Sequence, residues 1–254
     1  MARIINICSG KGGVGKTTIA ANLGAALQKL DQKVAVIDCN LTTSHLSLYL
    51  GMYSFPNTLN SFLKNESKLE DAVYKHSSGI SFVPASLNIK DLVNVDVSRL
   101  KDTIKQVFSE YNIVLIDSAP GLGKEAMISL QISDEVLFIA NPFIPSVVDI
   151  SKCKQVIEGM DSKLIPIGII LNRVKNKKYE LTKNEVRQFV ELPVIGVVPE
   201  DENVLKGVNK KELVTISNNK SPASKAFFSI ASYLTGVQYE KPRFSWWPFR
   251  RKAI

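Results

Sequence analysis

The sequence predicts a single α/β domain with a mostly parallel, twisted β-sheet flanked by helices on both faces. Short apolar runs rich in Val and Ile alternate with longer stretches whose apolar residues recur at helical spacing. The runs do not alternate in polarity, as expected of parallel strands covered on both faces. A chain of 254 residues, of which 45% are hydrophobic, can also bury one sizeable core.

Six apolar runs are the predicted strands, and amphipathic stretches between them are the predicted helices. Ile19, Leu23 and Leu27 mark the apolar face of a helix after the first run, and Leu100 and Ile104 mark another. Alternation of strands and helices is typical of a parallel sheet. The runs are Ile4–Ile7, Val34–Ile37, Ile113–Ile116, Val136–Ile139, Ile165–Leu171 and Val194–Val198.

The positive charge of the chain is concentrated at its C-terminal end. The formal net charge is +8, and five basic residues without an acid fall within residues 241–254, which leaves +3 for the rest. A nearly balanced body does not by itself indicate nucleic-acid binding. We therefore divide the chain into a domain over residues 1–240 and a basic, aromatic tail over residues 241–254.

Composition and patterning exclude several classes of protein. Disorder, collagen and coiled coil do not fit this composition. The longest uncharged apolar run, Leu164–Leu171, is far shorter than the roughly 18 residues of a membrane-spanning helix, and we expect no secretory signal. Cys8, Cys39 and Cys153 form no C-x-x-C pair, so we expect reduced core thiols rather than a disulfide framework or a zinc or iron–sulfur site.

A glycine-rich loop after the first predicted strand carries the main functional signal. It fits G-x-x-x-x-G-K-[ST] in full, with a strand before it and a helix after it. Glycines let backbone N–H groups turn toward phosphate oxygens, Lys16 brings a charge to the β- and γ-phosphates, and the Thr17 hydroxyl suits Mg²⁺. The loop comprises Gly10, Lys11, Gly12, Gly13, Val14, Gly15, Lys16, Thr17 and Thr18.

The same glycines also match the dinucleotide pattern G-x-G-x-x-G through Gly10, Gly12 and Gly15, with Asp38 ending the second strand. A Lys-Thr pair directly after the last glycine has no role in pyrophosphate binding, so we prefer the phosphate-loop interpretation. A phosphate loop also needs a carboxylate near its metal, at the end of a buried strand. Asp117, directly after Ile113–Ile116, is the candidate.

With these motifs the chain resembles the MinD-like branch of the MinD/ParA family, the deviant Walker A group of P-loop ATPases. The distinguishing feature is a second lysine early in the loop, Lys11. The resemblance covers nearly the whole chain, and the cysteine pairs of the iron–sulfur and metal-insertion relatives are absent from the sequence. Other matching segments are Ile37–Leu41, Asp117–Gly121, Asp134-Glu135, Asn141-Pro142, Ser146-Val147, Asp149, Leu171–Val174, Val198–Asp201 and Ser221–Ser224.

The resemblance implies a role for each matching residue. Two ATP molecules would be sandwiched between two protomers, and Lys11 would reach the partner's phosphates like an intersubunit arginine finger. Lys16 would hold the phosphates of its own subunit, Thr17 and Asp117 would serve the Mg²⁺, and Asp38 would belong to the segment that senses the γ-phosphate. Asn172, Arg173, Pro199 and Glu200 would lie on the adenine and ribose side.

Asn40 departs from the family pattern. Many relatives carry an aspartate there, which orients or deprotonates the attacking water, and an amide cannot take a proton at neutral pH. An amide can still orient water, so we expect slow hydrolysis, with Asp38 or the γ-phosphate as other acceptors of the proton. His45 and His76 have no acid or thiol neighbour in the sequence, and we expect surface or core-edge positions for both.

The C-terminal tail combines aromatic and basic residues, which suits an anionic membrane interface. A family-type amphipathic helix would be interrupted by Pro248. Docking onto the protein's own surface or onto a protein partner, and stacking on single-stranded nucleic acid, are the alternatives. The residues concerned are Phe244, Trp246, Trp247, Phe249, Arg250, Arg251 and Lys252.

The resemblance implies a cytoplasmic, peripheral membrane ATPase that uses ATP and Mg²⁺ and forms an ATP-dependent homodimer. Such a switch would recruit or position an activating or cargo protein in division-site, polar or appendage placement. One alternative is a ParA-type DNA-segregation ATPase using Lys175, Lys177, Lys178, Lys210 and Lys211, although we expect those lysines to form a solvated face. The other is an ATP-binding adaptor that hardly hydrolyses ATP.

Overall fold

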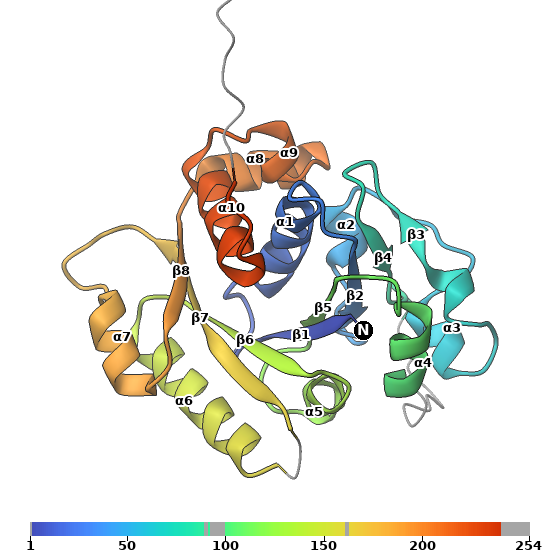
Figure 1. Cartoon of the computed structure of the whole chain (residues 1–254), viewed down its shortest axis with the longest axis horizontal. Helices are drawn as coiled ribbons and strands as arrows, with labels where there is room; N and C mark the ends of the chain where they lie inside the picture. Colours follow the sequence, from blue (N-terminus) through green and yellow to red (C-terminus); the bar gives the residue numbers. More distant parts are fainter. Residues whose placement is uncertain (1, 89–90, 92–99, 161–162, 240–254) are drawn as a thin grey trace, which may run out of the picture.

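An eight-stranded sheet runs through the centre of the computed structural model, which describes residues 2–88, 91, 100–160 and 163–239 (Figure 1). The strand order is β3-β4-β2-β5-β1-β6-β7-β8. All neighbouring strands are parallel except β3, which is antiparallel to β4. The strands are β1 (Arg3–Cys8), β2 (Val34–Cys39), β3 (Tyr74–Lys75), β4 (Ser81–Val83), β5 (Ile113–Ser118), β6 (Glu135–Ala140), β7 (Ile165–Val174) and β8 (Val194–Pro199).

The helices cover the two faces of the sheet, so the predicted α/β class is confirmed. Figure 1 shows α1, α2, α8, α9 and α10 on one side and α4, α5, α6 and α7 on the other. The helices are α1 (Lys16–Gln28), α2 (Leu46–Tyr49), α3 (Leu59–Leu63), α4 (Leu100–Val107), α5 (Lys124–Gln131), α6 (Ile144–Glu158), α7 (Lys183–Val190), α8 (Glu202–Lys210), α9 (Val214–Ser217) and α10 (Pro222–Thr235), with a short 3₁₀ turn η1 (Glu70–Ala72).

The first strand shows why the apolar runs do not alternate in polarity. Ile5 and Ile7 pack into the core beneath α1 and α10, whereas Ile4 and Cys8 pack on the opposite face. Each of these side chains is at most 1% exposed. A strand buried on both sides gains by being apolar at every position.

All six predicted strands are present, and the sequence reading missed two. β3 has two residues and β4 has three, too few for a periodic signal. Their position at one edge of the sheet rests on tertiary packing, in which the Tyr74 and Phe82 rings lie against Phe55.

The loops with candidate functional residues all leave the carboxyl ends of parallel strands. The chain passes from β1 to β2 on one side of the sheet, and β6, β7 and β8 extend it on the other. The loop after β1 therefore lies where the winding direction changes, which is where open α/β sheets place ligands.

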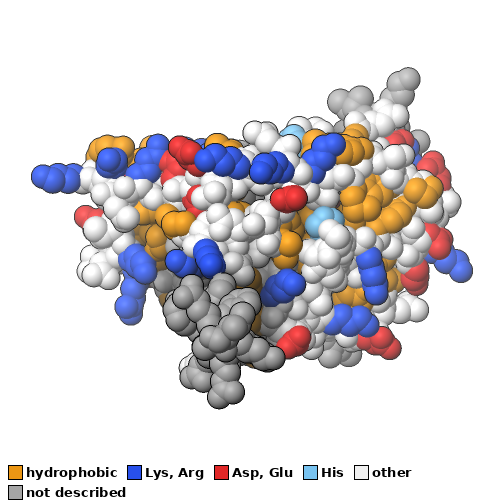
Figure 2. Space-filling model, turned by 90° about the horizontal axis from the view of Figure 1, so that it is seen from above, with side chains coloured by type: hydrophobic (Ala, Val, Ile, Leu, Met, Phe, Trp, Pro, Cys, Tyr) orange, Lys and Arg blue, Asp and Glu red, His pale blue; other side chains and the backbone are white. Residues whose placement is uncertain are grey.

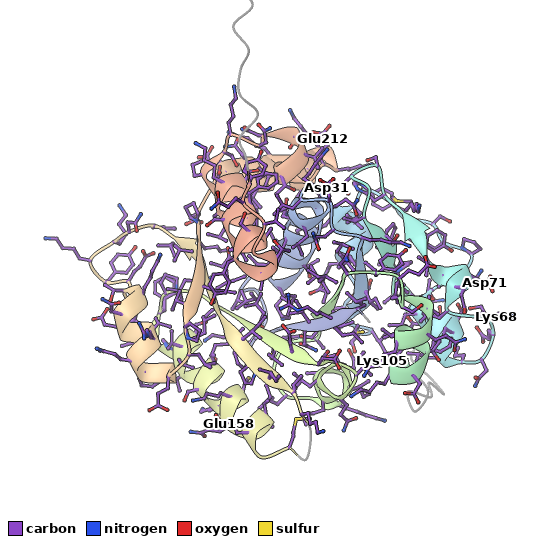
Figure 3. The ribbon with its side chains drawn as sticks, in the orientation of Figure 1. Asp31, Lys68, Asp71, Lys105, Glu158 and Glu212 are labelled. Carbon is purple, nitrogen blue, oxygen red and sulfur yellow. The ribbon has the colours of Figure 1, made fainter. Side chains whose placement is uncertain are left out.

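Cys8, Cys39 and Cys153 are free and buried, as expected of core thiols. Apart from Lys16, Asp38 and Asp117, the charged side chains of the described residues are not buried; Lys105 and Glu158 in Figure 3 are examples. Lys105 forms an ion pair with Asp134 at 3.4 Å. Within the described ranges, every helix is too short or too polar to cross a lipid bilayer.

Candidate functional site

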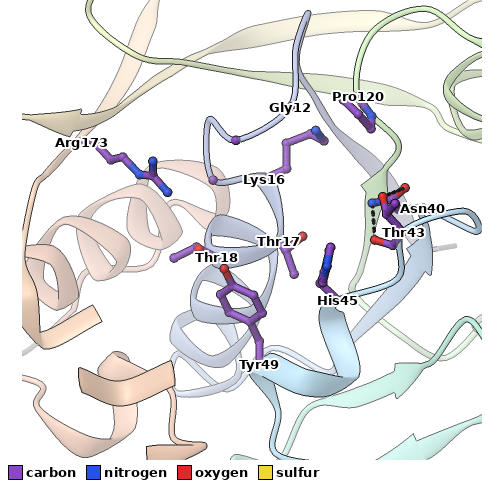
Figure 4. A pocket seen from close by; sticks show the side chains of 12 residues that line it. Gly12, Lys16, Thr17, Thr18, Asn40, Thr43, His45, Tyr49, Pro120 and Arg173 are labelled. Atoms are coloured by element: carbon purple, nitrogen blue, oxygen red, sulfur yellow. Dashed lines mark hydrogen bonds between the residues drawn. The ribbon is translucent and has the colours of Figure 1, made fainter. Parts of the chain in front are cut away.

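The loop between β1 and α1 borders a cavity of about 290 Å³ (Figure 4). Gly15 adopts a φ of +101°, and a Cβ built on it would lie 2.3 Å from Nδ2 of Asn172. At Gly10 an added Cβ would lie 2.2 Å from Cβ of Asp149. Both positions therefore require glycine on steric grounds. The cavity is lined by Gly12, Gly13, Gly15, Lys16, Thr17, Thr18, Asn40, Thr43, His45, Tyr49, Pro120 and Arg173.

Lys16 presents a buried ammonium group to this cavity. Its residue exposure is 7%, and its Nζ donates a hydrogen bond to Ser9 Oγ at 2.9 Å. Burial lowers the pKa of Lys16, and the carboxylate of Asp117 opposes that shift. A desolvated cation with one neutral hydrogen-bond partner is suited to an anionic phosphate.

Asp117, at the end of β5, carries the most conspicuous unsatisfied groups of the site. The residue is 1% exposed, and neither carboxylate oxygen accepts a hydrogen bond from the described part of the chain. Burial raises the pKa of Asp117, the charge of Asp38 raises it further, and the Thr17 hydroxyl lowers it. Two orphaned carboxylate oxygens near a hydroxyl fit a hydrated Mg²⁺, whose preferred ligands are oxygens.

Asp38 is turned into the loop that follows β2. Its Oδ1 accepts a hydrogen bond from the Asn40 N–H at 3.1 Å, and its Oδ2 accepts from Ser44 Oγ at 2.7 Å and the Leu46 N–H at 3.2 Å. The side chain is fully buried, and burial raises the pKa of Asp38. Asp38 therefore shapes the loop beside the cavity and does not line it.

Asn40 lines the cavity, but both ends of its amide are engaged by one residue. Nδ2 donates to the Thr43 carbonyl at 2.7 Å, and Oδ1 accepts from Thr43 Oγ1 at 3.0 Å (Figure 4). In this arrangement the amide stabilises the turn after β2. One N–H of Nδ2 and one lone pair of Oδ1 remain, so the amide can still orient a water molecule in the cavity.

Lys11 points away from the cavity that its own loop encloses. Its Nζ lies 3.5 Å from Oδ2 of Asp149 on α6, and its side chain is 48% exposed. It is absent from the residues that line the phosphate-side cavity. The early lysine is therefore presented outward, toward solvent.

A second cavity, of about 220 Å³, collects the four residues expected on the adenine and ribose side. Asn172, Arg173, Pro199 and Glu200 all line it, at the ends of β7 and β8. Asn172 also donates from Nδ2 to the Val14 carbonyl at 2.7 Å, which fixes the phosphate loop against β7. Thr18, Tyr49 and Arg173 line both cavities, so together these form one continuous groove.

Thr43, His45 and Tyr49 were missed as site residues by sequence reasoning. His45 is the N-cap of the four-residue helix α2 and Tyr49 is its last residue, about one turn further on, and both point toward the start of α1 in Figure 4. His45 is exposed, as expected, but it lines the phosphate-side cavity. Helix α2 is too short to be recognised from its apolar spacing.

The lysines considered for DNA binding have mixed surroundings. Lys175 forms an ion pair with Glu200 at 2.7 Å, and Lys211 lies over the Tyr53 ring at 4.7 Å. Figure 2 shows Lys and Arg side chains in a row along one edge of the face, with acidic side chains among them. This arrangement is typical of a solvated face.

The predicted tail lies outside the described residues. The last described residue, Tyr239, stacks on Phe228 of α10 with ring centroids 4.0 Å apart and an interplanar angle of 12°. Its N–H donates to Ser232 Oγ at 3.2 Å. The segment that leads to residue 240 is therefore held against α10, with Tyr239 packed on the buried Phe228.

Comparison with known proteins agrees with the geometry of this groove. The family model described as the CobQ/CobB/MinD/ParA nucleotide binding domain matches residues 5–214. The chain belongs to this family. An uncharacterized ATP-binding protein of Methanocaldococcus jannaschii is 37% identical over 94% of this chain and 90% of its own length. The septum site-determining protein MinD of Thermotoga maritima is 30% identical over 93% of this chain and 89% of its own.

Solved MinD structures share the fold over almost their full length. MinD of Pyrococcus horikoshii, complexed with Mg-ADP, is 31% identical with a TM-score of 0.87, covering 92% of this chain and 96% of that one. A MinC:MinD cell division protein complex of Aquifex aeolicus matches at 29% identity and a TM-score of 0.84, covering 95% and 99%. The chain is thus a MinD-like member of a family of nucleotide-binding ATPases.

Proposed function

We propose that this chain is a Mg²⁺- and ATP-dependent ATPase that dimerises in its ATP state and acts as a spatial switch. The observation that carries the proposal is the opposite orientation of two lysines in one loop. Lys16 faces its own cavity, whereas Lys11 faces outward beside Asp149. A lysine that cannot serve its own nucleotide is available to a second protomer.

Different residues of the groove would bind different parts of Mg-ATP. Backbone N–H groups of the phosphate loop and the Lys16 ammonium would bind the β- and γ-phosphates. Thr17 and Asp117 would hold Mg²⁺, whose charge offsets that of the phosphates. Arg173 and Pro199 would contact the nucleoside. The bound nucleotide of a partner would then receive Lys11, which stabilises charge on the transferred phosphoryl group.

Dimerisation is tested by measuring molar mass in Mg-ATP and in Mg-ADP. We expect a dimer in ATP and a monomer in ADP. Lys16→Ala should bind no nucleotide and remain monomeric. A stable ATP dimer of Lys16→Ala would contradict the role given to Lys16.

The second part of the proposal concerns the membrane. We propose that residues 1–240 form the ATPase domain and that the tail, residues 241–254, binds an anionic bilayer. Each basic residue near such a surface contributes about 1 kcal/mol, so one tail binds weakly. Two tails on one dimer bind with an avidity gain of about 10²-fold or more. The protein would thus be cytoplasmic when monomeric and peripheral on the inner membrane face when dimeric.

Co-sedimentation with anionic vesicles tests the membrane part. We expect the full chain to pellet in ATP but not in ADP, and a chain ending at Glu240 to stay in the supernatant. Absence of pelleting in every state would assign the tail to its own domain or to a protein partner. The complex of the Aquifex relative with MinC supports a search for an activating or cargo protein, in division-site, polar or appendage placement.

The amide of Asn40, which cannot take a proton at neutral pH, favours a second candidate function, an adaptor that binds ATP and hardly hydrolyses it. Single-turnover hydrolysis with and without anionic vesicles separates the two. Hydrolysis no faster than the uncatalysed background in both conditions would favour the adaptor. Steeply salt-dependent DNA binding by the chain ending at Glu240 would instead favour the ParA-type alternative.

A further inference from the structure

A further cavity adjoins the phosphate-side cavity on the far side of Asn40. Its volume is about 380 Å³, and Asn40, Thr43 and Pro120 line both spaces. It lies between the loop after β2 and the start of α5. Among the described residues that line it, Glu125 alone carries a carboxylate.

Glu125 is held over the loop after β2 by Thr42. The Thr42 hydroxyl donates a hydrogen bond to Oε1 of Glu125, and the Thr42 N–H donates to Oε2 at 3.3 Å. Thr42 is two residues from Asn40, so this pair fixes a carboxylate beside the position where the family pattern has an aspartate. Each carboxylate oxygen has two acceptor sites, so both oxygens can still accept another proton donor.

The other residues that could accept the proton of the attacking water are less suitable than Glu125. Asp38 is fully buried, lines neither cavity, and accepts hydrogen bonds from the loop after β2 through both oxygens. Asp117 is assigned to Mg²⁺ on the strength of its two orphaned oxygens. The Asn40 amide is engaged by Thr43 and cannot accept a proton.

We propose that Glu125 is a catalytic residue that accepts the proton of the attacking water, in place of the carboxylate absent at position 40. This inference rests on the proposed ATPase function. The water oxygen forms a bond to the γ-phosphorus, and the bond from that phosphorus to the β–γ bridging oxygen breaks. ADP leaves with the electron pair, and one water proton passes to the free site of a Glu125 oxygen and then to solvent. Thr42 is a positioning residue for this carboxylate.

The test compares Glu125→Gln with the wild type in the full chain with Mg-ATP. We expect the single-turnover rate to fall at least about tenfold, since general-base catalysis typically contributes about 10²–10⁴-fold. Nucleotide affinity and the mass of the ATP dimer should stay within twofold, because neither depends on the proton acceptor. Glu110→Gln, which removes an exposed carboxylate paired with Lys33, is the matched control and should keep the wild-type rate.

Two further variants sharpen the result. Asn40→Asp in the Glu125→Gln background should restore part of the lost rate, because it returns a carboxylate to the neighbouring position. Thr42→Val should slow hydrolysis and Thr42→Ser should rescue it, because the hydroxyl holds Glu125. If Thr42→Ser hydrolyses ATP as slowly as Thr42→Val, Thr42 is not a positioning residue.

The outcomes separate this inference from the proposed function. Wild-type hydrolysis with an unchanged rate in Glu125→Gln overturns the role of Glu125 and leaves the ATPase proposal standing. Loss of nucleotide binding in Glu125→Gln also overturns it, because the carboxylate would then be structural. A wild-type chain that binds ATP without hydrolysing it contradicts both proposals.

Discussion

The Nζ of Lys11 lies 3.5 Å from Oδ2 of Asp149, so the first lysine of the phosphate loop is held by helix α6 of its own chain. Dimerisation through Lys11 requires this contact to break. Both side chains are partly exposed, and such pairs contribute at most about 1 kcal/mol. The cost of releasing Lys11 is therefore small compared with the energy of a protein–protein interface.

Asp149→Asn should strengthen ATP-dependent dimerisation by up to about thirtyfold, because each of the two protomers then releases Lys11 without losing an ion pair of about 1 kcal/mol. The change keeps the volume of the side chain next to Gly10. The dimer dissociation constant can be measured by analytical ultracentrifugation in Mg-ATP. A weaker dimer would mean that Asp149 contributes to the dimer contact itself.

Gly15→Ala should abolish nucleotide binding. The added methyl group would lie 2.3 Å from Asn172 Nδ2 at a backbone φ of +101°, so the loop must change shape. Titration with a fluorescent ATP analogue checks this expectation. Gly159→Ala is the control, because Gly159 has φ −83° and an added Cβ meets only ordinary contacts. Unchanged affinity in Gly15→Ala would exclude this loop as the phosphate site.

Asp117→Asn should stabilise the protein in EDTA by roughly 1–3 kcal/mol near pH 8, because it removes a buried carboxylate without hydrogen-bond partners. In unfolded chains aspartate ionises near pH 4, whereas burial raises the pKa of Asp117 to about 7. Between these values the native state binds more protons, so the free energy of unfolding of the wild type falls as pH rises. The decrease in the free energy of unfolding with rising pH should be smaller in Asp117→Asn than in the wild type.

Urea denaturation at pH 4.5 and pH 8, with EDTA and then with Mg-ATP, measures both effects. Mg-ATP should stabilise the wild type more than Asp117→Asn, because the metal pairs with the carboxylate. A variant less stable than the wild type in EDTA at pH 8 would show that Asp117 has partners in the free protein.

Tyr49→Ala should weaken nucleotide binding by about two- to tenfold, because contacts of an aromatic ring contribute about 0.5–1.5 kcal/mol. Tyr49 lines both cavities of the groove. Tyr53→Ala, which removes a 48%-exposed ring, is the matched control. Isothermal titration with ATP distinguishes them, and equal affinities in the two variants would remove Tyr49 from the site.

The parts of the site that could be predicted from the sequence are short segments of contiguous residues. The phosphate loop, Asp117 and the Asn172–Arg173 segment each follow a recognisable buried strand, and parallel strands bring their carboxyl ends to one edge. Thr43, His45, Tyr49 and Glu125 belong to irregular loops, a four-residue helix and the first turn of α5. Their approach to the cavity depends on packing between segments about 80 residues apart, as between Thr42 and Glu125.

The sequence also did not predict which way the polar side chains after β2 point. Asp38 and Asn40 look alike in the sequence as polar residues after a buried strand. Their hydrogen bonds decide that Asp38 serves Ser44 and Leu46, and that Asn40 serves Thr43. The fold class could be predicted, since six apolar runs of four or more residues alternating with helical patterns are a strong signal, whereas β3 and β4 have at most three residues.

The molar mass of the full chain in Mg-ATP, measured by light scattering after size exclusion, tests the dimeric switch most directly. We expect twice the 28.1 kDa chain mass in ATP, the mass of one chain in ADP, and one chain in ATP for Lys11→Ala. A monomer in ATP, or an ATP dimer that Lys11→Ala forms as readily as the wild type, would contradict a lysine acting between two subunits.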